Sequence, residues 1–194
     1  MARAFARAFG APLVSSTVSR LLVDLNRSIR HPQVFSEAMR VAPGPLRDTV
    51  VERFYRPYRE RVERLVRQAV SRGRRVIHVS SHSFTPELHG KVRSADVGLL
   101  YHPGRRGEVA LCALWKESLA SLAPELRVRR NYPYSGKSDG FTAFLRRRFP
   151  AIEYIGIELE INQGIIQEGG RAWRQRRTLV IKSLAQAIRQ WRSN

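Results

Sequence analysis

Short apolar segments alternate along this chain with longer segments of helical period, and this alternation limits the fold more than any other feature of the sequence. Expected strands cover residues 18–25, 75–80, 96–101, 126–129 and 153–161, and expected helices cover residues 2–9, 46–71, 108–122, 139–149 and 171–191. Such alternation is typical of an α/β fold, in which helices cover both faces of a mixed, mostly parallel sheet. The length of 194 residues suits one domain, so we expect a single domain over residues 1–194.

Local signals refine two of the expected helices. Pro57 lies inside the helix 46–71, and a kink or a division into two helices is expected there because proline lacks the backbone N–H of a helix interior. Asp139 is a plausible N-cap for the helix 139–149. Residues 31–45, which include Pro43-Gly44-Pro45, are expected to form a loop.

The chain carries a formal net charge of +19 at pH 7, and 31 of its 35 basic residues are Arg. A charge of this size is typical of proteins that bind polyanions, nucleic acid among them. The basic residues are spread along the chain, however, in short clusters at 72–75, 127–130, 146–148 and 171–177. The excess of Arg over Lys is also what a coding bias produces. We therefore rank nucleic-acid binding third, after the two hypotheses that follow below.

Cysteine usage and hydropathy exclude several classes of protein. Cys112 is the only cysteine, which rules out an internal disulfide and a cysteine-cluster zinc site, and its apolar surroundings predict a small core residue. No segment approaches the roughly 18 consecutive apolar residues of a membrane span. The Arg-rich start, residues 1–10, resembles a targeting peptide superficially and fits a helix equally well. Cytoplasmic localisation is the default expectation.

His82 follows the expected strand 75–80, in the run His78-Val-Ser-Ser-His82-Ser-Phe-Thr-Pro86. A neutral imidazole at a strand end is a suitable zinc ligand, and ligands of α/β sheets bind beyond the carboxyl ends of the strands. A histidine in a polar turn is otherwise a surface or capping residue, and the residues alone leave this choice open. His78 lies within the strand and is interpreted as a core residue or as a partner of a ligand.

Glu158 and Glu160 alternate with Ile157, Leu159 and Ile161, which predicts that both carboxylates lie on one face of a strand. Two buried carboxylates without partners would be costly, so they either face solvent on an edge strand or line a functional cleft. A glutamate beside a metal-bound water is a general base for amide hydrolysis.

Two further segments carry candidate binding residues. Asp24-Leu-Asn26-Arg27 follows an expected strand, and Arg is a natural clamp for a substrate carboxylate because its planar fork donates two parallel hydrogen bonds. Arg20 is a candidate for stabilising an oxyanion. In a chain with 31 Arg residues, the alternative is that these two have no special role. The polar, aromatic loop 131–140 is a candidate cover for a substrate.

Together these segments resemble the N-formylglutamate amidohydrolase-like family, relatives of the zinc carboxypeptidases and aspartoacylases. The resemblance is carried by Ser19-Arg20-Leu-Leu-Val-Asp24-Leu-Asn26-Arg27-Ser28, His82-Ser83-Phe84-Thr85-Pro86, Asn131-Tyr132-Pro133-Tyr134 with Asp139-Gly140, and Gly156-Ile157-Glu158-Leu159-Glu160. It implies a zinc-carboxypeptidase-like fold and a zinc-dependent hydrolase that removes the acyl group of an N-acyl amino acid.

The resemblance also implies a role for each matching residue. His82 corresponds to a metal ligand, Glu158 to the general base or acid, with Glu160 as the alternative, and Arg20 to the oxyanion stabiliser. Asn26 and Arg27 correspond to the clamp for the substrate carboxylate, and Tyr132 is a further candidate for substrate binding.

The chain departs from the family pattern near its start, because nothing before Arg20 matches the family's upstream glutamate and histidine motif. We therefore expect a chain that is incomplete at the N-terminus, with an incomplete zinc site. The second hypothesis is an inactive family member that binds acyl amino acids or anions through Arg20 and Arg27. A missing first strand would open a sheet edge, which predicts self-association.

Overall fold

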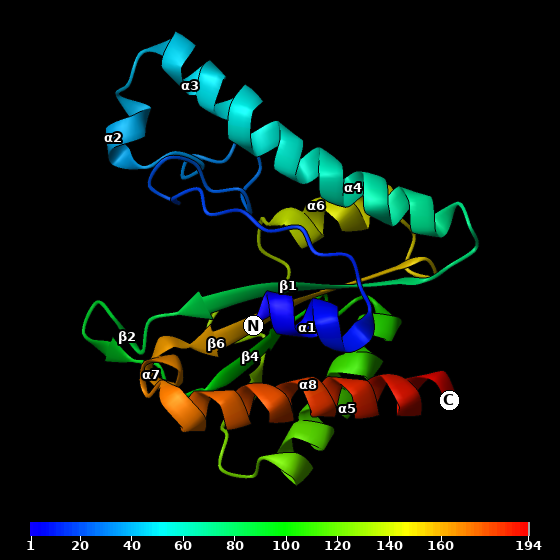
Figure 1. Ribbon diagram of the computed structural model, residues 1–194. Coiled ribbons are helices and arrows are strands. Elements are labelled where there is room, and N and C mark those ends of the chain that lie inside the picture. Colours follow the sequence, from blue (N-terminus) through cyan, green and yellow to red (C-terminus); the bar gives the residue numbers. More distant parts are fainter. Residues whose placement is uncertain (194) are drawn as a thin grey trace. The chain divides into compact units, whose positions relative to one another are not determined.

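A computed structural model describes residues 1–193, and its internal contacts divide the chain into two compact units (Figure 1). The sheet unit comprises residues 1–11, 77–138 and 155 onward, and the helical unit comprises residues 12–76 and 139–154. Each unit has hydrophobic clusters of its own. That residues 1–194 form one domain stays a prediction.

Four strands form a mixed sheet in the sheet unit, in the order β1-β6-β4-β5. Their bounds are Val76–Phe84 for β1, Val97–Leu100 for β4, Val128–Arg130 for β5 and Tyr154–Asn162 for β6. β4 pairs in parallel with β5 and antiparallel with β6. The α/β class with a mixed sheet is therefore confirmed. β1 and β5 are the edge strands of this sheet, and self-association through an open edge stays a prediction.

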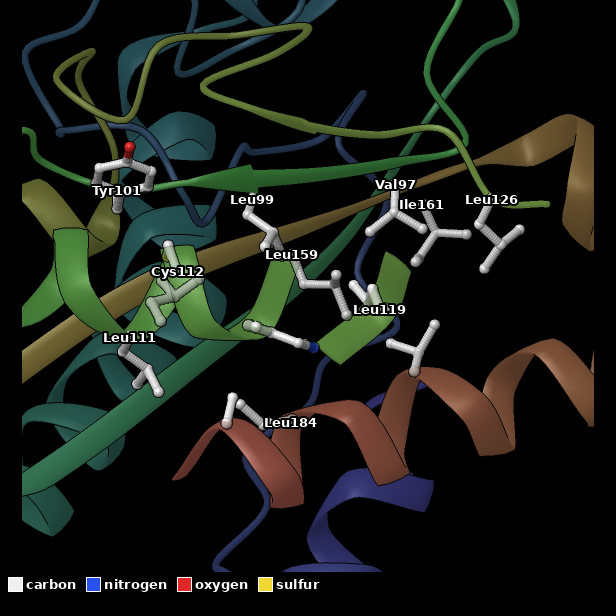
Figure 2. Close-up of a cluster of buried hydrophobic side chains, with 14 of the residues drawn as sticks. Val97, Leu99, Tyr101, Leu111, Cys112, Leu119, Leu126, Leu159, Ile161 and Leu184 are labelled. Atoms are coloured by element: carbon white, nitrogen blue, oxygen red, sulfur yellow. The ribbon is translucent and has the colours of Figure 1, made fainter. Parts of the chain in front are cut away.

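Three helices of the sheet unit, α1 (Ala2–Phe9), α5 (Arg106–Leu122) and α8 (Gly170–Ser193), share one hydrophobic core with the sheet. Figure 1 shows α5 and α8 on the same side of the sheet. Figure 2 shows Leu99 and Leu159, which pair across β4 and β6, beside Leu119 of α5. Cys112 is fully buried in this core, as predicted. In the described part of the chain, no helix is both long enough and apolar enough to cross a membrane.

Two short features of the sheet unit were not expected from the sequence. A hairpin of β2 (Glu87–Leu88) and β3 (Lys91–Val92) follows β1, and its turn residues His89 and Gly90 have φ angles of 50° and 71°. Two-residue strands are too short to show a period, so only the turn-forming Gly90 signals them. The helix α7 (Gln163–Gln167) begins directly after β6, where the Asn162 side chain accepts the Gly164 N–H.

The helical unit consists of α2 (Glu37–Arg40), α3 (Gly44–Val50), α4 (Arg56–Val70) and α6 (Phe141–Arg148). A π-helical turn over Val51–Tyr55 joins α3 to α4 without a break. The predicted helix 46–71 therefore changes its winding just before Pro57. The helix is not divided at Pro57, and the expected kink stays a prediction; a π turn accommodates the donor that the proline removes from the helical hydrogen-bond ladder.

The strand predicted over residues 18–25 is wrong. The N–H groups of Leu22 and Val23 both donate to the carbonyl oxygen of Ser19, at 2.9 and 3.2 Å, so the backbone turns instead of extending. Val23 is fully buried in a small cluster that also contains Val50 of α3. Its apolar side chains bury against a helix, and the segment needs no partner in a sheet.

Candidate active site

Three polar side chains of β1, His78, Ser80 and His82, lie on one face of the sheet. Ile77 and Val79 alternate with them and pack against the hydrophobic core on the other face. The sequence places His82 in a turn beyond the strand, but β1 runs past it. The predicted strand ended too early because the polar Ser and His residues at its end do not show the apolar pattern of a strand. His82 therefore shares a sheet face with His78.

Ser80 and His82 form a hydrogen-bonded pair on this face. The Ser80 Oγ lies 2.8 Å from the His82 Nε2. Side chains two residues apart in a strand point the same way, so the pair follows directly from the strand conformation. The hydroxyl orients the imidazole, and an oriented imidazole is suited to exchange a proton or to bind a metal ion.

Glu158 and Glu160 lie on β6, between β1 and β4 in the sheet. Ile157 and Leu159 alternate with them and belong to the hydrophobic core, so both carboxylates lie on the face that carries His82. Glu158 is 9% exposed and Glu160 is 5% exposed. The sequence left open whether these residues face solvent on an edge strand. They do not, because β6 is an inner strand and both residues are buried.

Tyr132 lies next to this face through its backbone. A Cβ atom on Gly98, which pairs with Glu160 across β4 and β6, would meet the Tyr132 carbonyl oxygen. The Tyr132 hydroxyl accepts a hydrogen bond from the Ser94 backbone N–H at 3.1 Å, and the Arg129 guanidinium lies 4.4 Å from the ring centre. The described contacts of the Tyr132 hydroxyl are thus structural, and its predicted role in substrate binding stays a prediction.

The loop that contains Tyr132 is fastened to the sheet unit. Asn131 Oδ1 accepts the backbone N–H groups of Tyr101 and Gly136, at 3.0 and 3.1 Å. Gly136 lies so close to the Tyr101 backbone that a Cβ atom would come within 2.3 Å of it. These contacts anchor the segment that the sequence marks as a candidate cover.

Asn26 lies in the helical unit and holds the start of α6. Its Oδ1 accepts the Phe141 backbone N–H at 2.8 Å, and its own N–H donates to Asp24 Oδ1 at 2.9 Å. The predicted N-cap at Asp139 is wrong, because the cap residue is Gly140 and its side chain cannot accept a hydrogen bond. Asn26 takes over the capping role from far along the chain.

Arg27 and Arg20 also make contacts within the helical unit. Arg27 Nη1 donates to the Asp139 carbonyl oxygen at 3.0 Å, and Arg20 Nη2 donates to Asp24 Oδ2 at 2.6 Å. The Arg20 side chain is 69% exposed, so this ion pair is screened by solvent. The roles of both arginines toward a substrate stay predictions.

The Asp139 carboxylate fixes the residue that follows Arg27. It accepts hydrogen bonds from the Ser28 hydroxyl and, at 2.8 Å, from the Ser28 backbone N–H. Burial by itself would raise the pKa of Asp139, but the hydrogen bonds from Ser28 and the charges of His31 and Arg27 outweigh burial and lower that pKa. Asp139 is therefore an ionised anchor for residues 26–28.

Arg59 is a functional candidate that sequence reasoning missed. It is only 6% exposed, and its Nη1 donates to the carbonyl oxygens of Leu25 and Arg27 at 3.1 and 3.3 Å. Its guanidinium carbon lies 4.1 Å from the Phe141 ring centre. Burial lowers the pKa of Arg59, while the neighbouring Tyr55 and Asp139 act in the opposite direction. A signal was present, because Arg59 falls on the apolar stripe of α4 with Val62 and Val66.

The described residues offer no complete set of metal ligands. Within residues 1–193, no three or more His, Cys, Asp or Glu side chains are arranged to hold a metal ion. A catalytic zinc normally has three protein ligands. The described residues therefore do not fit a complete zinc site, although His82 and the two glutamates share one sheet face.

The predicted site residues fall into two groups. His82 and Glu158 belong to the sheet unit, where β1 and β6 bring them to one face, and the Tyr132 backbone lies next to that face. The segment with Arg20, Asn26 and Arg27 belongs to the helical unit, where Asp139 and Arg59 fix it.

A mixed α/β sheet that carries two buried carboxylates and two half-buried histidines on the face opposite its hydrophobic core is an arrangement suited to an enzyme. The chain belongs to the N-formylglutamate amidohydrolase family, whose sequence model matches residues 1–167. This membership confirms the resemblance carried by the segments around Arg20, His82, Tyr132 and Glu158.

Two solved structures have a similar fold. A gene product of Agrobacterium tumefaciens is 26% identical, with a TM-score of 0.80, and the match covers 97% of this chain and 75% of that one. The N-formylglutamate amidohydrolase of Ralstonia eutropha JMP134 is 20% identical, with a TM-score of 0.68, and the match covers 100% of this chain and 83% of that one. No curated protein matches the sequence significantly.

Proposed function

We propose that this chain hydrolyses the amide bond of an N-acyl amino acid of the N-formyl type. Family membership supports an amidohydrolase, and the sheet face that carries half-buried His82 with buried Glu158 and Glu160 is the observation that supports it most directly. Buried carboxylates are costly for stability, and such costs, on a sheet face that also carries an oriented imidazole, are typical of sites that move protons.

The proposed chemistry needs a proton acceptor that later becomes a donor. A water oxygen bonds to the acyl carbon while a carboxylate takes the water proton. The C–N bond then breaks and the leaving nitrogen receives a proton, which gives a carboxylic acid and a free amino acid. We assign this proton transfer to Glu158, with Glu160 on the same face as the alternative.

Zinc belongs to the proposal as an implication of the family resemblance. His82 would be one of its ligands, and a bound zinc would polarise the acyl oxygen or the attacking water. Because the described residues do not fit a complete zinc site, no step is assigned to the metal. Metal content is best measured by elemental analysis of the same sample that is assayed.

The resemblance supports roles for Asn26 and Arg27 in binding the substrate carboxylate, and for Arg20 in stabilising the oxyanion. Their described hydrogen bonds hold the backbone around residues 24–28 in place. Substrate binding through Arg27 predicts that Arg27→Gln raises KM more than it lowers kcat.

The test is release of free glutamate from N-formyl-L-glutamate by the purified chain and by three Glu→Gln variants. Glu158→Gln should lower turnover by a factor of about 100 or more. Glu117→Gln, which makes the same change at an exposed position of α5, should keep full activity. If calorimetry detects substrate binding and the assay detects no turnover, the result favours the second hypothesis, an inactive family member that binds acyl amino acids. Full turnover in both Glu158→Gln and Glu160→Gln would overturn the assignment.

A further inference from the structure

The helix α8 carries cations without any anion. Its 24 residues include no Asp or Glu, and they include seven basic residues: Arg171, Arg174, Arg176, Arg177, Lys182, Arg189 and Arg192. α8 belongs to the sheet unit and lies beyond residues 1–167, the stretch that matches the amidohydrolase family. Its charge is therefore a feature separate from the family's sequence pattern.

Five of these side chains form one line along the exposed surface of α8, here called the cationic face: Arg171, Arg174, Lys182, Arg189 and Arg192. At about 100° per residue they fall within an arc of about 80°, and their positions span about 32 Å along the helix axis. The opposite side of α8, with Val180, Leu184 and Ala187, is buried in the hydrophobic core. The cations are thus presented outward in a row.

These cations differ from those on α4. Arg56 pairs with Glu52 at 2.5 Å and Arg67 pairs with Glu63 at 2.7 Å, each across one helical turn. Among residues 1–193, no ion pair involves any member of the cationic face, and a helix without acids offers none at the same spacing. An ordinary solvated helix surface mixes both signs, so the cationic face is not explained by solubility alone.

An open groove lies at the first half of this face. It has a volume of about 620 Å³, and Arg171, Arg174 and Arg176 line it with Gln175, Thr178 and a single carboxylate, Glu125. Guanidinium groups bind phosphate oxygens with two parallel hydrogen bonds. Arg176 already pairs with Glu168 at 2.5 Å, so Arg171 and Arg174 are the guanidinium groups that the groove offers to a phosphate group.

We propose that the cationic face of α8 binds the phosphate backbone of a duplex nucleic acid without reading its bases. A row of cations about 32 Å long matches a linear polyanion better than a small ligand. Among the described residues of α8, no large apolar side chain is exposed. The cationic face therefore has no aromatic platform on which the bases of a single strand could stack. It also has no apolar surface that could insert into a membrane. The basic residues are scattered along the sequence, whereas the helix α8 gathers five of them on one surface.

Counterion release makes the proposal quantitative. If each of the five cations neutralises one phosphate, the logarithm of the association constant falls against the logarithm of salt concentration with a slope of about −4.5. Affinity for a labelled 20-base-pair DNA duplex should then drop about 500-fold between about 50 and 200 mM salt. Fluorescence anisotropy of that duplex, titrated with the full chain, measures both quantities.

Two charge-matched variants test the location of the site. Replacing Arg171, Arg174 and Lys182 by Gln leaves two cations on the face, which predicts a slope of about −1.8 and a drop of only about 12-fold over the same salt range. Replacing the exposed Arg53, Arg61 and Arg64 by Gln removes the same charge from the helical unit and should leave the wild-type slope unchanged. Circular dichroism melting verifies that both variants fold like the wild type.

Each of three outcomes would overturn the proposal. The first is that the wild-type chain shows no binding to the duplex at about 50 mM salt. The second is that both triple variants lose affinity equally, which would assign the binding to the net charge of the chain. The third is that vesicles of anionic phospholipid bind the wild type more tightly than the duplex does, which would make a membrane surface the partner.

Discussion

Gly98 leaves room for the carbonyl oxygen of Tyr132, since a Cβ atom at position 98 would lie 2.0 Å from that oxygen. Gly98 also pairs with Glu160 on the neighbouring strand. The loop that carries Tyr132 can therefore lie directly on the sheet face that holds the two glutamates.

Gly98→Ala should destabilise the protein by about 2 kcal/mol or more, because the strand or the loop has to move to admit the methyl group. Gly44→Ala is the matched control. A Cβ atom there meets nothing within 4 Å apart from its chain neighbours, and the restriction that Pro45 places on the residue before it opposes the better helix propensity of alanine, so the control should change stability by less than about 1 kcal/mol. Urea denaturation of both variants measures the difference, and equal stability of the Gly98 variant and the wild type would contradict this packing.

Arg59→Ala should lower the free energy of unfolding by about 3 kcal/mol, because the carbonyl oxygens of residues 25 and 27 lose a charged, buried donor. Arg59→Lys should recover only part of this loss, since an ammonium group cannot stack flat on the Phe141 ring. Arg61→Ala on the exposed side of α4 should change stability by less than about 0.5 kcal/mol. Similar losses for the Arg59 and Arg61 variants in the same denaturation assay would refute the anchoring role.

Asp139 should make stability depend on pH in the acid range. Its pKa is lower in the folded protein than in the unfolded chain, so the stabilisation is complete above the ordinary pKa of about 4 and is lost as pH falls through the folded pKa. The melting temperature of Asp139→Asn should therefore lie below that of the wild type at about pH 6, and the gap should shrink toward about pH 3. A gap that stays constant over this range would show that the Asp139 charge does not stabilise the fold.

The sequence predicted best those elements whose period is long or regular. The helices 108–122 and 171–191 and the strand 153–161 were found because a sustained apolar pattern identifies an element whatever surrounds it. The segment 18–25 shows the limit of this reasoning. Its apolar residues would suit a strand equally well, and only the nearby Val50 of α3 shows that they pack against a helix.

The sequence allowed candidate site residues to be proposed, but not their environment. Glu158 and His82 were proposed from their local pattern and the family resemblance, whereas the burial of Glu158 follows from the position of β6 between two other strands. Such a strand order depends on contacts between distant residues, and no local pattern encodes it. Asp139 illustrates the same point, because its partner Ser28 lies 111 residues away in the chain.

The central claim is tested most directly by measuring the formate that the purified wild-type chain releases from N-formyl-L-glutamate. Bound zinc is determined in the same sample. The account predicts equimolar formate and glutamate over many turnovers, and loss of both in Glu158→Gln. Folded wild-type protein that releases no formate, even after zinc is added, would contradict the assignment of this chain as an amidohydrolase.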